Sequence, residues 1–201
     1  MKVSIAKALF NSYSYSEYKK IVSDLLSEGK STGNEQSEDF FHYSTLNETR
    51  IKRLDKTILI AEDISLQIKA LKKKYIWLVI AEGWCGDAAQ ILPIINKMTA
   101  ESDNVELKIV FRDLNDDLMK EFLTNKSRAI PKLICIDKES GEFGGQWGPR
   151  PQAAADLIKN YKTEHGVVDE DAKSQLQLWY LHDKGFSVQR EIMELMTSIE
   201  N

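Results

Sequence analysis

Cys85 is the residue of this sequence best placed to act as a nucleophile. It lies in a short polar junction, EGWCGDA at residues 82–88, between the apolar run YIWLVIA at 75–81 and a helix-type pattern that begins at Ala88. The backbone N–H groups and the dipole at the start of a helix stabilise an anion, so the position favours a thiolate and a lowered thiol pKa. Because the thiolate is the nucleophile of disulfide exchange, we expect redox chemistry at Cys85; the alternative is a small buried apolar cysteine.

The elements that must position Cys85 follow from the hydrophobic pattern. The run at 75–81 is short, continuously apolar and rich in aromatic and β-branched residues, which is typical of a strand buried on both faces. The pattern predicts further strands at 57–61, 105–111, 132–137 and 142–147, and helices at 63–71, 88–98, 115–123 and 154–161. This order predicts an α/β fold with a mixed five-stranded sheet flanked by helices, whose first three strands are joined by right-handed crossovers.

Helical patterns also precede and follow this region. Residues 14–17 have capping-box spacing ahead of an apolar stripe, residues 30–39 are polar, and a second, short helix is expected to open at Thr45. Two more helices follow Gly166 and separate near Gly185. We therefore expect an N-terminal helical extension over 1–56, an α/β domain over 57–162 and a C-terminal helical extension over 163–201. The apolar stripes of the extensions cover the flanks of the sheet or, as the alternative, form a homodimer interface.

Composition and charge narrow the class of protein. The 201 residues carry 27 basic and 31 acidic side chains, a net charge of −4, with 42% apolar and 29% charged residues, as in globular proteins. The absence of a dense basic patch argues against nucleic acid, and no apolar run approaches the ~20 residues of a membrane span. The two cysteines and the lack of a signal-peptide pattern predict a cytoplasmic protein. The three histidines lack ligand spacing, so we expect no metal and no other cofactor.

Two segments resemble the thioredoxin family. Trp-Cys-Gly at 84–86 followed by Pro93 is similar to the active-site helix of that family with its kink proline, and Arg-Ala-Ile-Pro at 128–131 resembles the segment whose proline is cis and faces the cysteine. The resemblance covers about residues 57–162 and implies a thioredoxin-like fold with one N-terminal strand and helix added. The Gly-Asp-Ala motif at 86–88, together with WGPRP at 147–151, is most similar to the sequences of a bacterial subgroup that carries N-terminal helices.

This resemblance assigns roles to residues of the site. It implies that Cys85 is the catalytic cysteine. The active-site motif around it is formed by Trp84, Gly86, Asp87 and Ala88. The substrate groove is formed by Arg128, Ile130 and Pro131. Arg128 favours the thiolate or binds an anionic thiol cosubstrate, or else it is a solvated loop arginine. A carboxylate beside a thiol raises the thiol pKa, but we expect Asp87 instead to cap the helix through the first-turn amides.

Two departures from the family change the expected mechanism. Ala88 replaces the second cysteine, and Val79 replaces the buried carboxylate that assists it, so no Cys-x-x-Cys disulfide can form. Cys135 lies four residues beyond Pro131, about 13 Å along a strand, whereas a disulfide needs Cα atoms within about 7 Å, which assigns Cys135 to the core. Cys85 would then form a mixed disulfide that an external thiol resolves.

Two functions from different classes fit these observations. The first is a single-cysteine thiol–disulfide oxidoreductase whose partner is a disulfide-containing protein or a low-molecular-weight thiol. The second is a redox-inactive thioredoxin-fold module that binds proteins. Loss of the second cysteine favours the module, whereas retention of Trp84, Cys85, Gly86 and Pro131 favours the oxidoreductase, so the sequence leaves enzymatic activity open.

Overall fold

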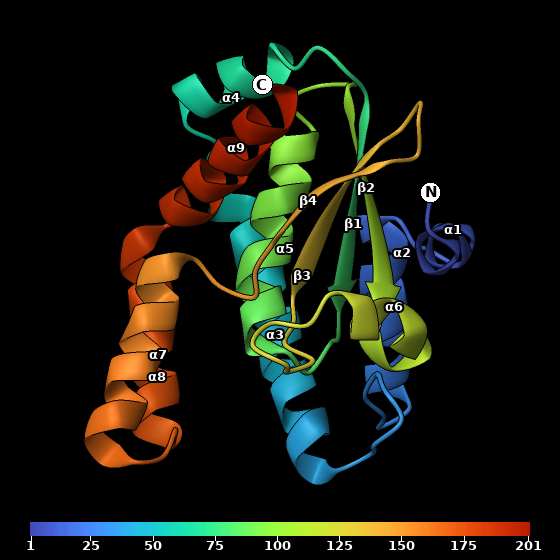
Figure 1. Cartoon of the computed structure of the whole chain (residues 1–201). Helices are drawn as coiled ribbons and strands as arrows, with labels where there is room; N and C mark the ends of the chain where they lie inside the picture. Colours follow the sequence, from blue (N-terminus) through green and yellow to red (C-terminus); the bar gives the residue numbers. More distant parts are fainter.

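A four-stranded sheet forms where the apolar runs of the sequence meet. The computed structural model describes all 201 residues, and its strands lie in the order β2-β1-β3-β4 (Figure 1). Their bounds are Tyr75–Ala81 for β1, Val105–Phe111 for β2, Lys132–Asp137 for β3 and Phe143–Trp147 for β4. β1 pairs in parallel with β2 and antiparallel with β3, and β3 pairs antiparallel with β4. The continuously apolar β1 is an interior strand, and six of its seven residues are buried, as its composition predicts.

The fifth strand expected at residues 57–61 is absent, so that prediction is wrong. Thr57 ends α3 (Glu38–Thr57), and residues 58–61 are an extended connection to α4 (Glu62–Lys69). A side chain satisfies the backbone there: Ala61 N–H donates to Gln189 Oε1 at 2.9 Å, and Gln189 Nε2 donates to the Leu59 carbonyl at 3.1 Å. The β-prone residues thus find an amide side chain of the C-terminal helix instead of a neighbouring strand.

The N-terminal part contains more helix than the pattern predicts. α1 spans Val3–Phe10, and α2 spans Tyr15–Ser27 behind the expected capping box of Ser14 and Glu17. α3 begins at Glu38, where Ser37 caps it, instead of near Thr45. The hydroxyl of Thr45 donates to the Phe41 carbonyl one turn earlier, so a residue that resembles a cap lies inside the helix.

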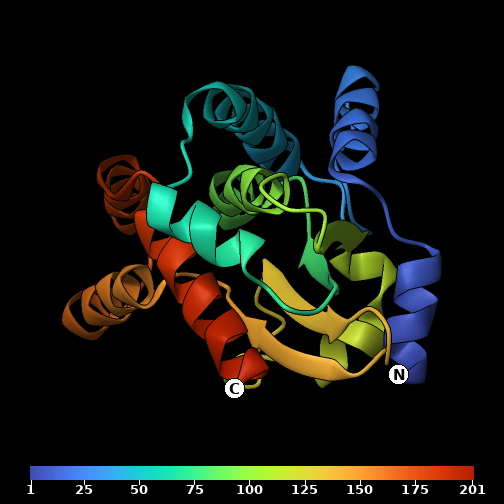
Figure 2. The same cartoon turned by 90° about the horizontal axis from the view of Figure 1, so that it is seen from above.

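Helices flank the sheet and place α3 close to the start of α5 (Gly86–Thr99). α5 follows β1 directly, and α3 packs along α5 with α2 (Tyr15–Ser27) beside it (Figures 1 and 2). α9 (Phe186–Glu200) crosses the β4 edge and contacts α4 and α5. The short η1 (Arg112–Leu114) and α6 (Asp116–Glu121) follow β2, and α1 contacts both β2 and α6. One continuous hydrophobic core runs through the sheet and these helices.

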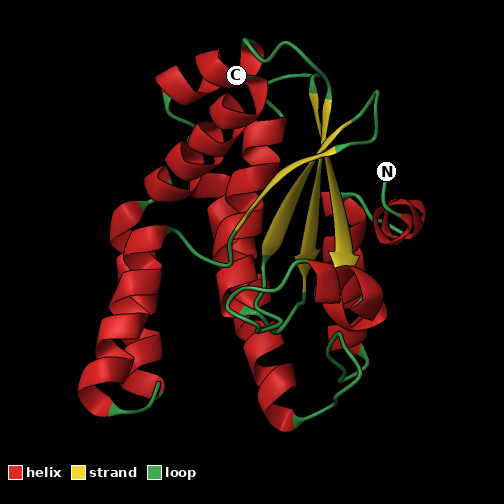
Figure 3. Cartoon of the chain, in the orientation of Figure 1, coloured by secondary structure: helices red, strands yellow, loops and turns green.

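The remaining two helices form a hairpin that projects from this assembly. α7 (Gln152–His165) and α8 (Glu170–Asp183) pack against each other, joined by a turn at Gly166 (Figures 1 and 3). Lys184 and Gly185, both in the left-handed region, end α8 and lead into α9. No helix of the chain has the length and apolar composition needed to cross a bilayer.

Candidate functional site

Cys85 lies between β1 and α5 and caps the helix with its sulfur. Its backbone is extended, and Sγ accepts a hydrogen bond from the Ala88 N–H at 3.4 Å. This is the bond that a serine or aspartate oxygen accepts at an ordinary helix start. The junction therefore places the thiol against the first-turn amides of α5, the position that the sequence pattern predicts.

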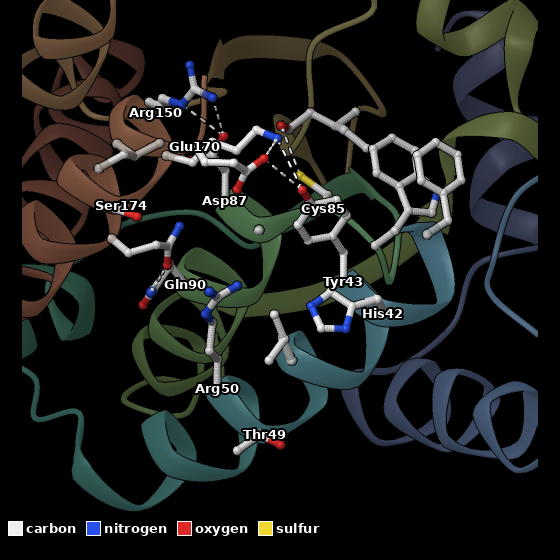
Figure 4. A pocket seen from close by; sticks show the side chains of 18 of the residues that line it. His42, Tyr43, Thr49, Arg50, Cys85, Asp87, Gln90, Arg150, Glu170 and Ser174 are labelled. Atoms are coloured by element: carbon white, nitrogen blue, oxygen red, sulfur yellow. Dashed lines mark hydrogen bonds and ion pairs between the residues drawn. The ribbon is translucent and has the colours of Figure 1, made fainter. Parts of the chain in front are cut away.

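Asp87 does not cap α5, so that expectation is wrong. The cap position belongs to Cys85, and the Asp87 carboxylate turns to residues distant in the sequence. Arg150 donates to Asp87 Oδ2 through Nε at 2.8 Å and through Nη2 at 2.7 Å, and the Tyr180 hydroxyl donates to Oδ1 at 2.8 Å. These bonds, drawn in part in Figure 4, tie α5 to the segment after β4 and to α8.

A proline-containing turn closes over the other side of the sulfur. The Ile130-Pro131 peptide bond is cis, and Cys85 Sγ donates to the Ile130 carbonyl at 3.4 Å. The following turn packs on this one, because a Cβ built on Gly148 would lie only 2.5 Å from the Pro131 carbonyl oxygen. Ile130 and Cys85, which are 45 residues apart, thus meet at the same place.

The surroundings of the Cys85 thiol favour its protonated form. Burial raises the pKa of the thiol to about 12, and the charge of Asp87 acts in the same direction. The amide of Ala88 and the guanidinium of Arg150 lower the pKa, but by less. The expectation of a lowered pKa is therefore wrong, because Cys85 is only 7% exposed and the cost of burying a thiolate exceeds the helix-terminus effect.

Cys85 lies at the edge of a large pocket. A cavity of about 1200 Å³ extends from the thiol between α3 and α8 (Figure 4). The two walls touch through a contact that we call the rim bridge: the Tyr43 hydroxyl donates to Glu170 Oε1 at 3.2 Å, and Lys173 Nζ donates to the Tyr43 hydroxyl at 3.1 Å. His42 lines the same pocket, but no hydrogen bond joins its ring to the thiol. The chain has no cluster of three or more metal-ligating side chains.

Trp84 forms an aromatic part of the pocket wall. Its ring stacks on Phe40 of α3 with centroids 4.7 Å apart and planes 8° apart, and the Arg112 guanidinium lies 4.7 Å from the ring centroid. The indole N–H has no hydrogen-bond partner. The tryptophan before the cysteine is therefore packed against an aromatic ring and a guanidinium in the wall of the pocket.

Of the three predicted groove residues, the structure brings Ile130 and Pro131 to the thiol but not Arg128. Ile130 and Pro131 contact or adjoin the thiol position, whereas Arg128 forms ion pairs with Asp116 at 3.0 Å and Asp113 at 3.6 Å. The arginine that touches the carboxylate beside Cys85 is instead Arg150. Arg128 lines the pocket from a distance, with its charge largely compensated.

Three further buried residues concern the departures from the family pattern. Val79 is fully buried hydrocarbon, but Glu82, the residue that follows the same strand, is a buried carboxyl that the pattern does not single out. Its Oε1 accepts the Asp113 N–H at 3.0 Å, Oε2 has no partner, and burial raises its pKa. Cys135 lies fully buried in β3 as a free thiol, and burial raises its pKa too.

Several residues of the site carry no motif that would reveal them. Tyr180, Tyr43 and Gln177 lie in helices whose patterns predict only packing. The segment at 147–151 does stand out in the sequence as an aromatic, proline-bounded turn, and we expect it, with lining of a groove near Pro131 as the alternative, to pack under the last helix. Trp147 does so, donating to Glu191 Oε2 of α9 at 2.8 Å, but Arg150 of the same segment reaches the site.

This arrangement defines an α/β protein with a cysteine at the start of a helix and a cis-proline turn against its sulfur. A sequence model of the family described as thioredoxin matches residues 33–162, which is more than half of the chain. The chain belongs to the thioredoxin family.

Solved structures with the same fold include two distant ones. An HIV epitope scaffold is 19% identical with a TM-score of 0.57, covering 92% of this chain and 98% of that one. A protein of unknown function from Pseudomonas aeruginosa is 18% identical with a TM-score of 0.54, covering 94% of this chain and 98% of that one. At these identities the likeness concerns the fold alone. A comparison with curated proteins gives no match.

Proposed function

We propose that the protein is a single-cysteine thiol–disulfide oxidoreductase that acts through a mixed disulfide at Cys85. The observation that carries this proposal is the position of Sγ, which sits on the first amides of α5, against the Ile130 carbonyl and at the edge of a pocket. A cysteine that only fills space in the core does not need helix amides, a cis-proline turn and a pocket at its sulfur.

The exchange is balanced without a second cysteine. The Cys85 thiol gives its proton to solvent, and the thiolate attacks one sulfur of a disulfide, so that a Cys85–substrate disulfide forms and the other sulfur leaves as a thiolate. An external thiolate then attacks this mixed disulfide on the substrate sulfur, and Cys85 is released as a thiolate. In one cycle the external thiol replaces the leaving sulfur in the disulfide, and the protein returns unchanged. Oxidation of two external thiols to a disulfide takes a second cycle on the new mixed disulfide.

The first helix amides assist this cycle when the thiolate forms. The Ala88 N–H already points at Sγ, and the Arg150 guanidinium is the nearby cation that lowers the thiol pKa. Both groups are in place before a substrate arrives, so they need no rearrangement at the moment of reaction. The carbonyl of Ile130 accepts a hydrogen bond from the thiol in the resting state, and this bond is lost when the thiol is deprotonated.

The same proposal includes a subgroup of the family, a cellular compartment and a division of the chain into three parts. The Trp-Cys-Gly-Asp-Ala motif and the N-terminal helices support an assignment to a bacterial single-cysteine subgroup of the family. An exchange that depends on an external thiol suits a reducing compartment, the cytoplasm. In this proposal the division into 1–56, 57–162 and 163–201 serves the site. The central part carries Cys85, and the parts before and after it supply α3 and α8, the two pocket walls.

A second candidate is a redox-inactive binding module, and the buried thiol favours it. A thiol whose pKa lies near 12 is almost entirely protonated at neutral pH, which slows attack on a disulfide. In this alternative, the pocket binds its partner without forming a covalent bond, and Cys85 fills the space beneath it.

Reduction of a glutathionylated test protein by glutathione separates the two functions. The full chain is expected to accelerate it, Cys85→Ser to abolish the acceleration, and Cys135→Ser to retain it as the matched control. Acceleration that persists in Cys85→Ser would contradict the mechanism. No acceleration by the unmodified chain between pH 7 and 9 would contradict the oxidoreductase and favour the binding module.

A further inference from the structure

The pocket beside Cys85 carries more positive charge than its carboxylates neutralise. Five arginines line it, contributed by α3, by the region after β2, by the turn before β3 and by the segment after β4: Arg50, Arg53, Arg112, Arg128 and Arg150. The whole chain, in contrast, has a net charge of −4. The positive charge is therefore local to this cavity.

Three of these arginines have acidic partners. Arg150 is held by Asp87, as described above. Arg112 donates to Asp113 at 2.8 Å, and Arg128 lies 3.6 Å from the same carboxylate. These side chains hold their places through ion pairs within the protein and leave little charge for a ligand.

Arg50 and Arg53 have no carboxylate within ion-pair distance. They lie three residues apart on α3, so they share one face of the helix, and Arg50 donates from Nη1 only to the Asn47 side-chain oxygen at 2.7 Å. Arg50 is half-buried, and burial together with the like charge of Arg53 lowers its pKa. A bound anion would relieve both the lost hydration and the repulsion.

The Arg50 guanidinium reaches the residue next to the reactive sulfur. A Cβ built on Gly86 would lie 3.8 Å from Arg50 Nη1 and 3.7 Å from Gln177 Nε2, so both groups border the space that the glycine leaves open. Gln177 receives a hydrogen bond from Gln90 on its Oε1 at 2.7 Å, which turns its amide N–H₂ toward that space. Figure 4 shows Arg50 reaching from α3 toward Gln90.

We propose that Arg50, Arg53 and Gln177 bind a carboxylate of a low-molecular-weight thiol, and that the disulfide of this thiol is the substrate of Cys85. A guanidinium pairs with a carboxylate in a planar, two-bond geometry, and the amide adds a further donor. A thiol built from amino acids carries a sulfur and a carboxylate on one small molecule. The cavity of about 1200 Å³ is large enough for such a molecule.

The substrate class rests on the disulfide exchange proposed above, whereas the carboxylate site does not. In the exchange, the bound carboxylate keeps its charge and takes no part in bond making. The Cys85 thiolate attacks the sulfur of the bound molecule, the Cys85–sulfur bond forms, and the second sulfur of the substrate disulfide leaves as a thiolate. Binding therefore orients the sulfur and is measurable without any redox step.

Calorimetric titration with S-methylglutathione, whose sulfur cannot exchange, tests the site. We expect binding to the full chain at millimolar or lower concentration, unchanged within about twofold in Cys85→Ser. The double variant Arg50→Gln/Arg53→Gln should bind about tenfold or more weakly, the loss expected when hydrogen bonds to a charged group are removed. Lys52→Gln, also on α3 but paired with Glu48, is the matched control and should bind normally.

The dimethyl ester of the same probe supplies a test that needs no variant, since it keeps the peptide and the sulfur and removes the two carboxylate charges. It should bind at least tenfold more weakly to the unmodified chain. Absent binding of the acid, equal binding of acid and ester, or normal binding by the double variant would overturn the carboxylate site. Inorganic phosphate binding as tightly as the acid would overturn the ligand class. If the carboxylate site holds while Cys85→Ser leaves disulfide exchange intact, only the proposed function falls.

Discussion

At the scale of single residues, opposing effects act on the Cys85 thiol. The start of α5 and the Arg150 guanidinium favour the thiolate, whereas burial and the Asp87 charge favour the thiol and prevail. Arg150 and Tyr180 hold Asp87 in place, so the acid beside the sulfur is a fixed part of the structure. The reactivity of Cys85 is thus set by a carboxylate as well as by the helix.

The first prediction concerns pH. Below its pKa of about 12, the fraction of Cys85 present as thiolate rises tenfold for each pH unit. The rate of alkylation by iodoacetamide should therefore be low at pH 7 and rise about tenfold per unit through pH 10, as read by mass spectrometry. Cys135, fully buried, reports any unfolding in the same sample. A plateau below pH 9 would mean that the thiol is far more acidic than its burial implies.

The second prediction removes the acid. In Asp87→Asn, the charge that raises the Cys85 pKa is gone while Arg150, which lowers it, remains, so the thiol pKa should fall. A fall of one unit is tenfold in thiolate, and alkylation at pH 8 should quicken by at least about that factor. Tyr180→Phe keeps the charge and loses one hydrogen bond, so its rate should change much less.

Asp87→Asn should also lower the free energy of unfolding. Asparagine leaves the Arg150 guanidinium without its carboxylate, which destabilises the fold by up to about 3–5 kcal/mol. Thermal unfolding and the labelling of Cys135 show whether the variant is folded during the assay. An unchanged rate of Cys85 alkylation in a folded Asp87→Asn protein would show that the Asp87 charge does not raise the thiol pKa.

At the scale of elements, two turns hold the site in shape. The turn that contains Pro131 supplies the carbonyl against Cys85, and the turn after β4 packs onto it at Gly148. Gly148 has a φ of +105°, and a Cβ there would meet a backbone oxygen, which cannot swing away as a side chain does. Position 148 therefore requires glycine for both conformation and space.

The third prediction follows from this contact. Gly148→Ala should lower the free energy of unfolding by about 1–3 kcal/mol for the backbone strain alone, with the clash against Pro131 in addition. Gly166→Ala is the matched control, since Gly166 also has a positive φ, +78°, but open space around it. Urea unfolding compares the two. Equal losses in both variants would show that the close approach to Pro131 contributes nothing.

The elements that could be predicted from the sequence are those whose signal is local. The apolar run of β1 and the capping box of α2 lie within the segments that they describe, and both form as expected. Residues 58–61 have a strand-like composition too, but their backbone partner is Gln189, more than 120 residues away. A local pattern cannot reveal whether an extended segment meets a strand or a side chain.

At the scale of the whole molecule, parts from both ends of the chain complete the site. α3 and α8 form the pocket walls, and the rim bridge of Tyr43, Glu170 and Lys173 joins residues 127–130 positions apart. Resemblance predicts the meeting of Cys85 and Ile130, because the family pattern contains both. It does not predict Arg150 or Tyr180 at Asp87, since these contacts depend on how the α7–α8 hairpin packs.

The fourth prediction concerns the rim bridge. Tyr43→Phe removes both of its hydrogen bonds and leaves Glu170 paired with Lys173, so the pocket should open more often. Alkylation of Cys85 should rise about 2–5-fold, the factor for about 0.5–1 kcal/mol of exposed polar contact. Tyr161→Phe, which loses a hydroxyl bond to Asp169 on the same hairpin, should leave the rate unchanged. Equal rates in both variants would show that the bridge does not limit access.

Formation of a mixed disulfide is the step on which the proposed activity depends. Incubation of the full chain with oxidised glutathione at pH 9, followed by intact-mass and peptide mass spectrometry, measures it directly. We predict one glutathionyl group per chain, located on Cys85, removed by added thiol and absent from Cys85→Ser. A folded chain that acquires no adduct, or an adduct located on Cys135, would contradict thiol–disulfide exchange at Cys85.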